Sequence, residues 1–160
     1  VIAATARTNT EIALAAAIPG ILPWTAALLP ATSFSDMILL TKNQGMMILR
    51  IAAVYGLEVD PRQRFAELGG VVGAAFGWRS IAREVVGAVP GGVGAAAKGA
   101  IAYAGTVAAG RAAEVFYATG RRPTQDERKA WYEDATERAK SVVAESLDRL
   151  RRKDPEGSPA

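Results

Sequence analysis

The chain has 160 residues, no cysteine, no histidine and a formal net charge of +3. That length can bury a hydrophobic core without a disulfide or a structural metal. A chain without cysteine forms no disulfide, thiolate nucleophile or cysteine zinc site, and one without histidine lacks the commonest general base and transition-metal ligand. The sequence offers no candidate catalytic, cofactor-binding or metal-binding residue, so we expect a protein that is not an enzyme.

The N-terminal region predicts a short helix followed by an apolar hairpin. The capping-box pattern at 8–11 predicts a helix over about 9–18. No charged residue occurs from Ile12 to Ser35, but three prolines interrupt this segment, at Pro19, Pro23 and Pro30. Because proline breaks a straight helix, a second short helix over about 22–32 is favoured over one membrane-spanning helix. The hairpin would then either re-enter a membrane or lie buried in a helical bundle.

A longer helix is predicted over about 36–55, with Ser35 as its N-cap and Gly56 as its C-terminal stop. Three polar side chains interrupt its apolar sequence, at Asn43, Gln44 and Arg50. If they are buried they need partners, since an unpaired buried polar group is costly. The alternative is that they face solvent or lipid headgroups.

For Arg50 the sequence predicts a specific kind of partner. If its face of the helix is buried, its guanidinium needs a carboxylate partner. Glu67 and Glu84 are the acids on the next two predicted helical stretches. We therefore expect a structural inter-helix ion pair rather than a substrate contact.

Small residues dominate the middle of the chain, where a helix is predicted from about Val93 to Thr119 and is closed by Gly120. Small residues at intervals of four allow helix backbones to approach closely. Four glycines are expected to pack against neighbouring helices: Gly70, Gly73, Gly99 and Gly105. The Gly-x-Gly-x-x-Ala sequence at 92–97 resembles a dinucleotide-binding turn, but it follows Pro90 rather than a buried strand, which favours a glycine-rich helix start.

The last predicted helix is amphipathic and charged. A second capping box, Thr124 to Glu127, marks its start. Six residues recur on one face: Trp131, Ala135, Ala139, Val142, Ser146 and Leu150. Four basic residues close the helix: Arg149, Arg151, Arg152 and Lys153. This basic end could contact anionic lipid or complement the helix dipole, whereas acids interleaved along the helix disfavour nucleic acid as a partner.

Together these patterns predict an all-α fold, a compact helical bundle with a proline-broken apolar hairpin and a long amphipathic C-terminal helix. We expect an apolar helical domain over 1–120, a charged amphipathic helix over 121–153 and a disordered tail over 154–160.

Several segments together resemble a bacterial domain found in YcjF-type inner-membrane proteins and fused to Era-like small GTPases. The segments that carry the resemblance lie between about residues 5 and 120: 18–23, 43–56, 68–77, 89–91, 98–99 and 103–106. The resemblance implies a helical domain on the cytoplasmic side of the bacterial inner membrane that docks or regulates a GTPase, in cis or in trans. It supplies no catalytic residues. The alternative is a soluble helical interaction or oligomerisation domain, including a homo-oligomer, in the cytoplasm.

Overall fold

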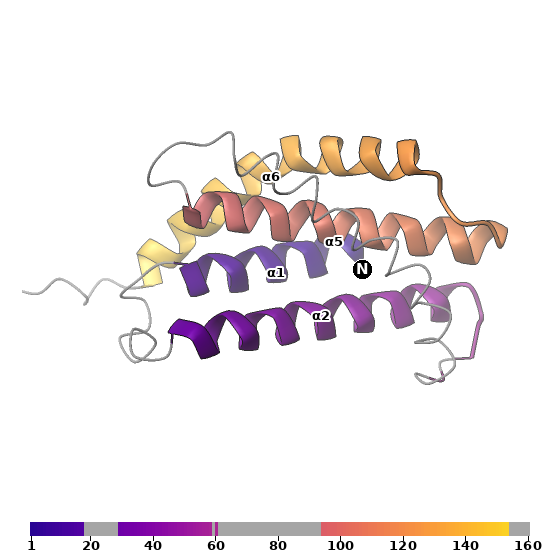
Figure 1. The fold of residues 1–160 in the computed structure, drawn as a ribbon, viewed down its shortest axis with the longest axis horizontal. Coiled ribbons are helices and arrows are strands. Elements are labelled where there is room, and N and C mark those ends of the chain that lie inside the picture. The colour runs from indigo at the N-terminus through magenta and orange to yellow at the C-terminus, as the bar shows by residue number, and fades with distance from the viewer. Residues whose placement is uncertain (18–28, 59, 61–93, 154–160) are drawn as a thin grey trace, which may run out of the picture.

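The structure is a computed structural model that describes residues 1–17, 29–58, 60 and 94–153. Four helices occur in these ranges: α1 (Ile2–Ala17), α2 (Leu29–Val54), α5 (Gly94–Thr119) and α6 (Gln125–Lys153). The same ranges contain no strand. The prediction of a compact all-α bundle is therefore confirmed (Figure 1).

Helix α5 lies at the centre of the bundle. It contacts α1, α2 and α6, and α1 also touches both outer helices. Helices α6 and α2 lie on opposite sides of the central α1–α5 pair (Figure 1). The buried residues of α5 include Gly99, Tyr103, Ala104, Gly105 and Thr106, which point in several directions around the helix. A helix buried on most sides needs small apolar residues throughout, which explains its alanine and glycine content.

Helix α1 begins seven residues earlier than the predicted start at about residue 9. Its first helical residue is Ile2, so the capping-box pattern at 8–11 lies inside the helix. The first turns are helical because Ala6, which is fully buried, belongs to a core shared with α5 and α6. Asn9 and Thr10, the two middle residues of that pattern, are fully buried.

The start of helix α2 also differs from the prediction. It runs from Leu29 to Val54, so the predicted break before Ser35 is wrong, and Ser35 lies within the helix. Pro30 falls in the first turn, where its missing N–H removes no intrahelical hydrogen bond. The hairpin residues 18–28 lie outside the described ranges.

The predicted C-terminal stops of α2 and α5 are both confirmed. Gly56 has a φ of 73°, and Leu57 N–H donates to Ala52 O at 3.2 Å while Gly56 N–H donates to Ala53 O at 3.0 Å. These two bonds form a Schellman motif. Gly120 has a φ of 71°, and its N–H donates to Phe116 O at 2.8 Å, which closes α5.

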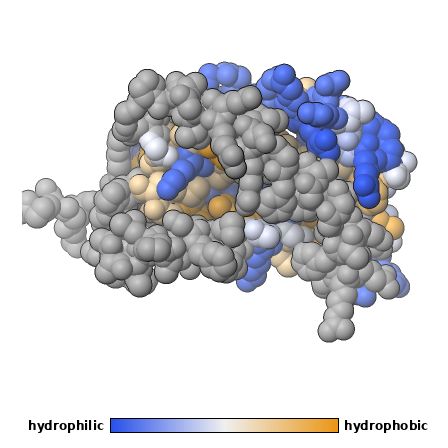
Figure 2. Space-filling model, viewed as in Figure 1, coloured by the Kyte–Doolittle hydropathy of each residue, from blue (hydrophilic) through white to orange (hydrophobic). Residues whose placement is uncertain are grey.

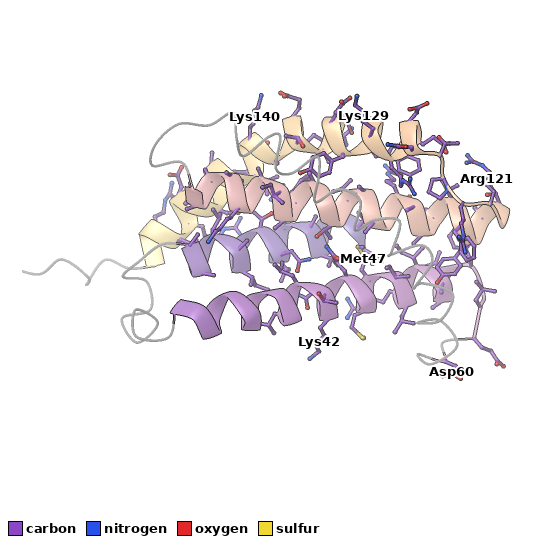
Figure 3. The ribbon with its side chains drawn as sticks, viewed as in Figure 1. Lys42, Met47, Asp60, Arg121, Lys129 and Lys140 are labelled. Atoms are coloured by element: carbon purple, nitrogen blue, oxygen red, sulfur yellow. The ribbon has the colours of Figure 1, made fainter. Side chains whose placement is uncertain are left out.

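The capping box at the start of α6 is also formed as predicted. Glu127 N–H donates to Thr124 Oγ1 at 3.2 Å, and Thr124 N–H donates to Glu127 Oε2 at 2.8 Å. The guanidinium of Arg121, labelled in Figure 3, reaches both carboxylate oxygens of Glu127, at 2.7 and 2.8 Å. Hydrogen bonding from Arg121 and from the Thr124 backbone lowers the pKa of Glu127 from 4.5 to about 2.

Glu127→Gln should lower the free energy of unfolding at neutral pH. The variant should also lose less stability than the parent chain when the pH is lowered. The carboxylate of Glu127 has a lower pKa in the folded state, so its contribution is full above about pH 4.5 and fades as the pH falls through about 2. Urea unfolding of both proteins between pH 7 and pH 2 measures this difference. A difference in the free energy of unfolding that stays constant over that pH range would contradict this expectation.

One hydrophobic core joins α6 to α1 and α5. It contains Tyr103 and Ala104 from α5, Ala6 from α1, and four α6 residues: Tyr132, Ala135, Ala139 and Val142. Of the six residues predicted on the inner face of α6, Ala135, Ala139, Val142 and Ser146 are buried, and Trp131 and Leu150 are half-buried. The opposite face of α6 is hydrophilic, as Figure 2 shows along the upper edge of the molecule.

Two ion pairs also connect α1 to α6. Arg7 Nη1 lies 3.1 Å from Glu145 Oε2, and Arg149 Nη1 lies 2.6 Å from Glu11 Oε1. All four side chains are between 38 and 54% exposed, so each pair contributes little to stability on its own. The pairs are four residues apart on both helices, which therefore run in the same direction.

A second core joins α2 to α5. Met47, Ile48 and Ile51 of α2 pack with Ala109 and Ala113 of α5. The inner face of α2 is therefore held by apolar packing from residue 47 onward, and the preceding turn is polar.

Candidate functional site

Polar side chains from three helices meet where α1, α2 and α5 come together. Asn9 of α1 donates from Nδ2 to Thr106 Oγ1 of α5 at 2.9 Å, and Asn43 of α2 donates from Nδ2 to Asn9 Oδ1 at 2.9 Å. Gln44 of α2 donates from Nε2 to the same Thr106 oxygen at 3.2 Å. We call these four residues the polar cluster. It brings together the predicted polar residues Asn43 and Gln44 with two partners that the sequence analysis did not identify.

The hydroxyl of Thr106 is fully used within the polar cluster. It accepts from Asn9 and Gln44 and donates to Ala102 O at 2.7 Å. Thr106 and Asn9 are both fully buried. A buried network whose members are satisfied fixes how its helices sit against one another, because any displacement leaves a buried polar group without a partner. The polar cluster therefore fixes the positions of α1, α2 and α5 relative to one another.

Arg50 does not join the polar cluster. It is exposed, so the burial on which its expected ion pair depended is not found. Glu67 and Glu84 lie outside the described ranges, and the pairing stays a prediction.

The exposed side of α2 combines apolar and basic residues. Leu39, Lys42, Met46, Arg50 and Val54 are all exposed and succeed one another at intervals of three or four residues. We call this set the α2 outer face. Leu39 and Met46 are each 45% exposed and Val54 is 76% exposed. Figure 3 shows Lys42 pointing away from the bundle, on the side opposite to Lys129 and Lys140 of α6.

A cavity of about 430 Å³ opens where the start of α1 and the end of α2 meet the middle of α5. Its walls include the apolar residues Ile2, Ala3, Ile51, Val54 and Val107. We call it the end cavity. Its aromatic and charged residues are Tyr55, Tyr103, Arg111, Glu114 and Arg138.

Two of the glycines make the close contacts between helices that the small-residue pattern predicts. A Cβ on Gly99 would lie 2.9 Å from Leu14 Cδ2 of α1 and 3.2 Å from Val143 Cγ2 of α6. A Cβ on Gly110, which the sequence analysis did not single out, would lie 2.7 Å from Ile2 Cγ1. Gly105 is buried, and Gly70 and Gly73 lie outside the described ranges.

The basic end of α6 is partly engaged within the bundle. Arg149 pairs with Glu11 of α1, whereas Arg152 is exposed. The side chains of Arg151 and Lys153 lie outside the described part of the structure.

None of the helices in the described part of the chain has a stretch long and apolar enough to cross a membrane. Residues 18–28 of the predicted apolar hairpin lie outside that part of the chain.

Comparison of the chain with protein-family models, with curated proteins and with solved structures found no match in any of the three.

Proposed function

We propose that this chain is a non-catalytic helical accessory domain that docks on the cytoplasmic surface of a bacterial inner membrane through the α2 outer face. The observation that carries the proposal is the composition of that face. Leu39, Met46 and Val54 are exposed apolar side chains, and Lys42 and Arg50 are exposed bases beside them. No Asp or Glu occurs in the sequence from 37 to 57.

An apolar and basic helical face without acids is complementary to an anionic bilayer surface. Apolar side chains enter the boundary between headgroups and acyl chains, while basic side chains pair with lipid phosphates. The hydrophilic side of α6, on the other side of the bundle, would face away from the membrane (Figure 2). This mode of binding needs no membrane-spanning helix.

A second copy of the chain fits this face less well than a lipid surface does. In a two-fold symmetric contact through α2, the bases Lys42 and Arg50 would meet the same two bases of the second copy, and like charges across an interface are costly. A homo-oligomer formed through this face is therefore the outcome that would replace our proposal.

The resemblance to domains that accompany Era-like GTPases extends the proposal to a GTPase-like partner, fused or separate. This part rests on the sequence segments quoted above. We expect the chain to change the rate of GTP hydrolysis by an Era-like GTPase of the same organism. An unchanged rate at a saturating concentration of the chain would remove the GTPase from the proposal without affecting the membrane contact.

The membrane contact is tested by flotation of the chain with lipid vesicles. We expect binding to vesicles that contain phosphatidylglycerol, weaker binding to phosphatidylcholine alone, and weakening by salt. Each basic residue at an anionic surface contributes about 1 kcal/mol. Lys42→Gln with Arg50→Gln should therefore reduce partitioning by about thirtyfold.

The matched control is Lys129→Gln with Lys140→Gln, which removes the same charge from the opposite side of the bundle. Its partitioning should stay near that of the parent chain. Equal losses in both double variants would show that net charge, rather than the α2 outer face, governs binding. No binding of the parent chain to either vesicle, or a stable dimer broken by Met46→Glu, would overturn the proposal.

A further inference from the structure

The end cavity has the size and lining of a small-molecule site. Its volume of about 430 Å³ falls within the range of roughly 300–1,000 Å³ that is usual for ligand pockets. Such pockets are mostly apolar, with a few polar groups that orient the ligand. Here Ile2 of α1, Ile51 of α2 and Val107 of α5 supply apolar walls from three different helices. An aliphatic body of moderate length would lie against these side chains.

Tyr103 adds a polar group inside the cavity. It is only 8% exposed and lines the cavity, yet it makes no hydrogen bond with any other residue in the described ranges. Its hydroxyl is not among the buried polar atoms without a partner, so it is accessible from the cavity and can bond a partner that enters there. A ligand oxygen is a suitable one.

The charged residues of the cavity favour an anion. Arg111 comes from α5 and Arg138 from α6, and among the lining residues in the described part of the chain Glu114 is the one acid. Arg111 Nη1 lies 2.9 Å from Glu114 Oε2, and Arg138 Nη2 lies 2.9 Å from Asp134 Oδ2. Both ion pairs are largely exposed and weak, and each guanidinium has five N–H donors. Both arginines can therefore take a further carboxylate.

We propose that the end cavity binds an amphipathic monocarboxylate. Its aliphatic body lies against Ile2, Ile51 and Val107, and its carboxylate pairs with the guanidinium groups of Arg111 and Arg138. A guanidinium binds the planar pair of carboxylate oxygens through two parallel hydrogen bonds, so each arginine offers a site that fits this group. The end cavity shares Val54 with the α2 outer face, but its two arginines do not belong to that face, so variants of the charged residues test the two sites separately.

The test is isothermal titration of the full chain with octanoate and with octanol, in the absence of vesicles. Octanoate should bind saturably, and octanol, which has the same body without the charge, should bind about tenfold more weakly. Arg111→Gln with Arg138→Gln should lower the octanoate affinity about tenfold and leave the octanol affinity unchanged. Lys42→Gln with Arg50→Gln removes the same charge elsewhere and should leave both affinities unchanged.

A second variant fills the cavity. Ala3 is exposed and lines the cavity, so Ala3→Phe introduces a ring there without disturbing the core, and it should abolish binding of both ligands. Circular dichroism would verify that each variant is folded. If Ala3→Phe does not fold, the arginine variants alone test whether octanoate binds in the end cavity. The proposal is overturned if octanoate does not bind, if octanol binds equally well, or if a folded variant with a filled cavity retains octanoate binding.

Discussion

Thr106→Val should lower the free energy of unfolding by about 2–4 kcal/mol, because it removes the acceptor shared by a buried donor, Asn9, and a half-buried donor, Gln44. Valine has nearly the shape of threonine, so the substitution leaves the packing unchanged. What it removes is the oxygen that accepts from Asn9 Nδ2 at 2.9 Å and from Gln44 Nε2 at 3.2 Å. Asn9 is fully buried, so water cannot replace the lost acceptor. Chemical unfolding at neutral pH measures the effect.

Two further variants separate the hydrogen bonds from the volume of the side chain. Thr106→Ser keeps the hydroxyl and should lose less stability than Thr106→Val. Asn9→Leu combined with Thr106→Val removes both partners of the buried bond, so the combined loss should be smaller than the sum of the single losses. Additive losses would mean that the polar cluster does not act as a unit.

Gly99→Leu is expected to cost about 1–3 kcal/mol through overpacking. Even a methyl group at Gly99 would lie 2.9 Å from Leu14 Cδ2, and Leu14 is fully buried. The larger side chain must therefore push α5 away from α1 and α6. The loss of contact outweighs the gain in helix propensity, which is at most about 1 kcal/mol when glycine is replaced. Thermal unfolding followed by circular dichroism measures the outcome.

Gly94→Leu is the matched control on the same helix. No atom lies within 4 Å of the position that its Cβ would take. It should be close to neutral. Because leucine has the higher helix propensity, a loss at Gly94 as large as that at Gly99 would show that the close contact is not the cause.

Features whose physical cause is local in the sequence were predicted well. The Schellman glycine at Gly56, the stop at Gly120 and the capping box from Thr124 to Glu127 all act through residues within one turn. The inner face of α6 follows from helical spacing alone. These features need no knowledge of the partner helix.

The start of α1 could not be predicted from the same kind of pattern. The capping-box residues at 8–11 match those at the start of α6, but α1 continues upstream because Ala6 and Ile2 pack against α5. That packing depends on residues about a hundred positions away. Helical spacing from Ala6 through Asn9 to Ala13 was the available signal that Asn9 faces the core.

The polar cluster was predicted only in part for a related reason. Asn43 and Gln44 are conspicuous as polar residues in an apolar helix. Thr106 lies in a helix of small residues, and a threonine, being small itself, does not interrupt that pattern. Arg50 stands out equally, yet it is exposed. Its position on the outer side of α2 is decided by which face packs on α5.

The alternating charges between α1 and α6 penalise misalignment during folding. Arg7 meets Glu145, and Glu11 meets Arg149, with opposite signs in the two successive turns. A slip of one turn in one direction would place Arg7 against Arg149, and a slip in the other would place Glu11 against Glu145. Apolar alanine faces such as those at Ala135 and Ala139 tolerate sliding, because one small residue replaces another. The order of the charges therefore specifies the register of α1 against α6, which an alanine interface alone does not. Each ion pair on its own still adds little to stability.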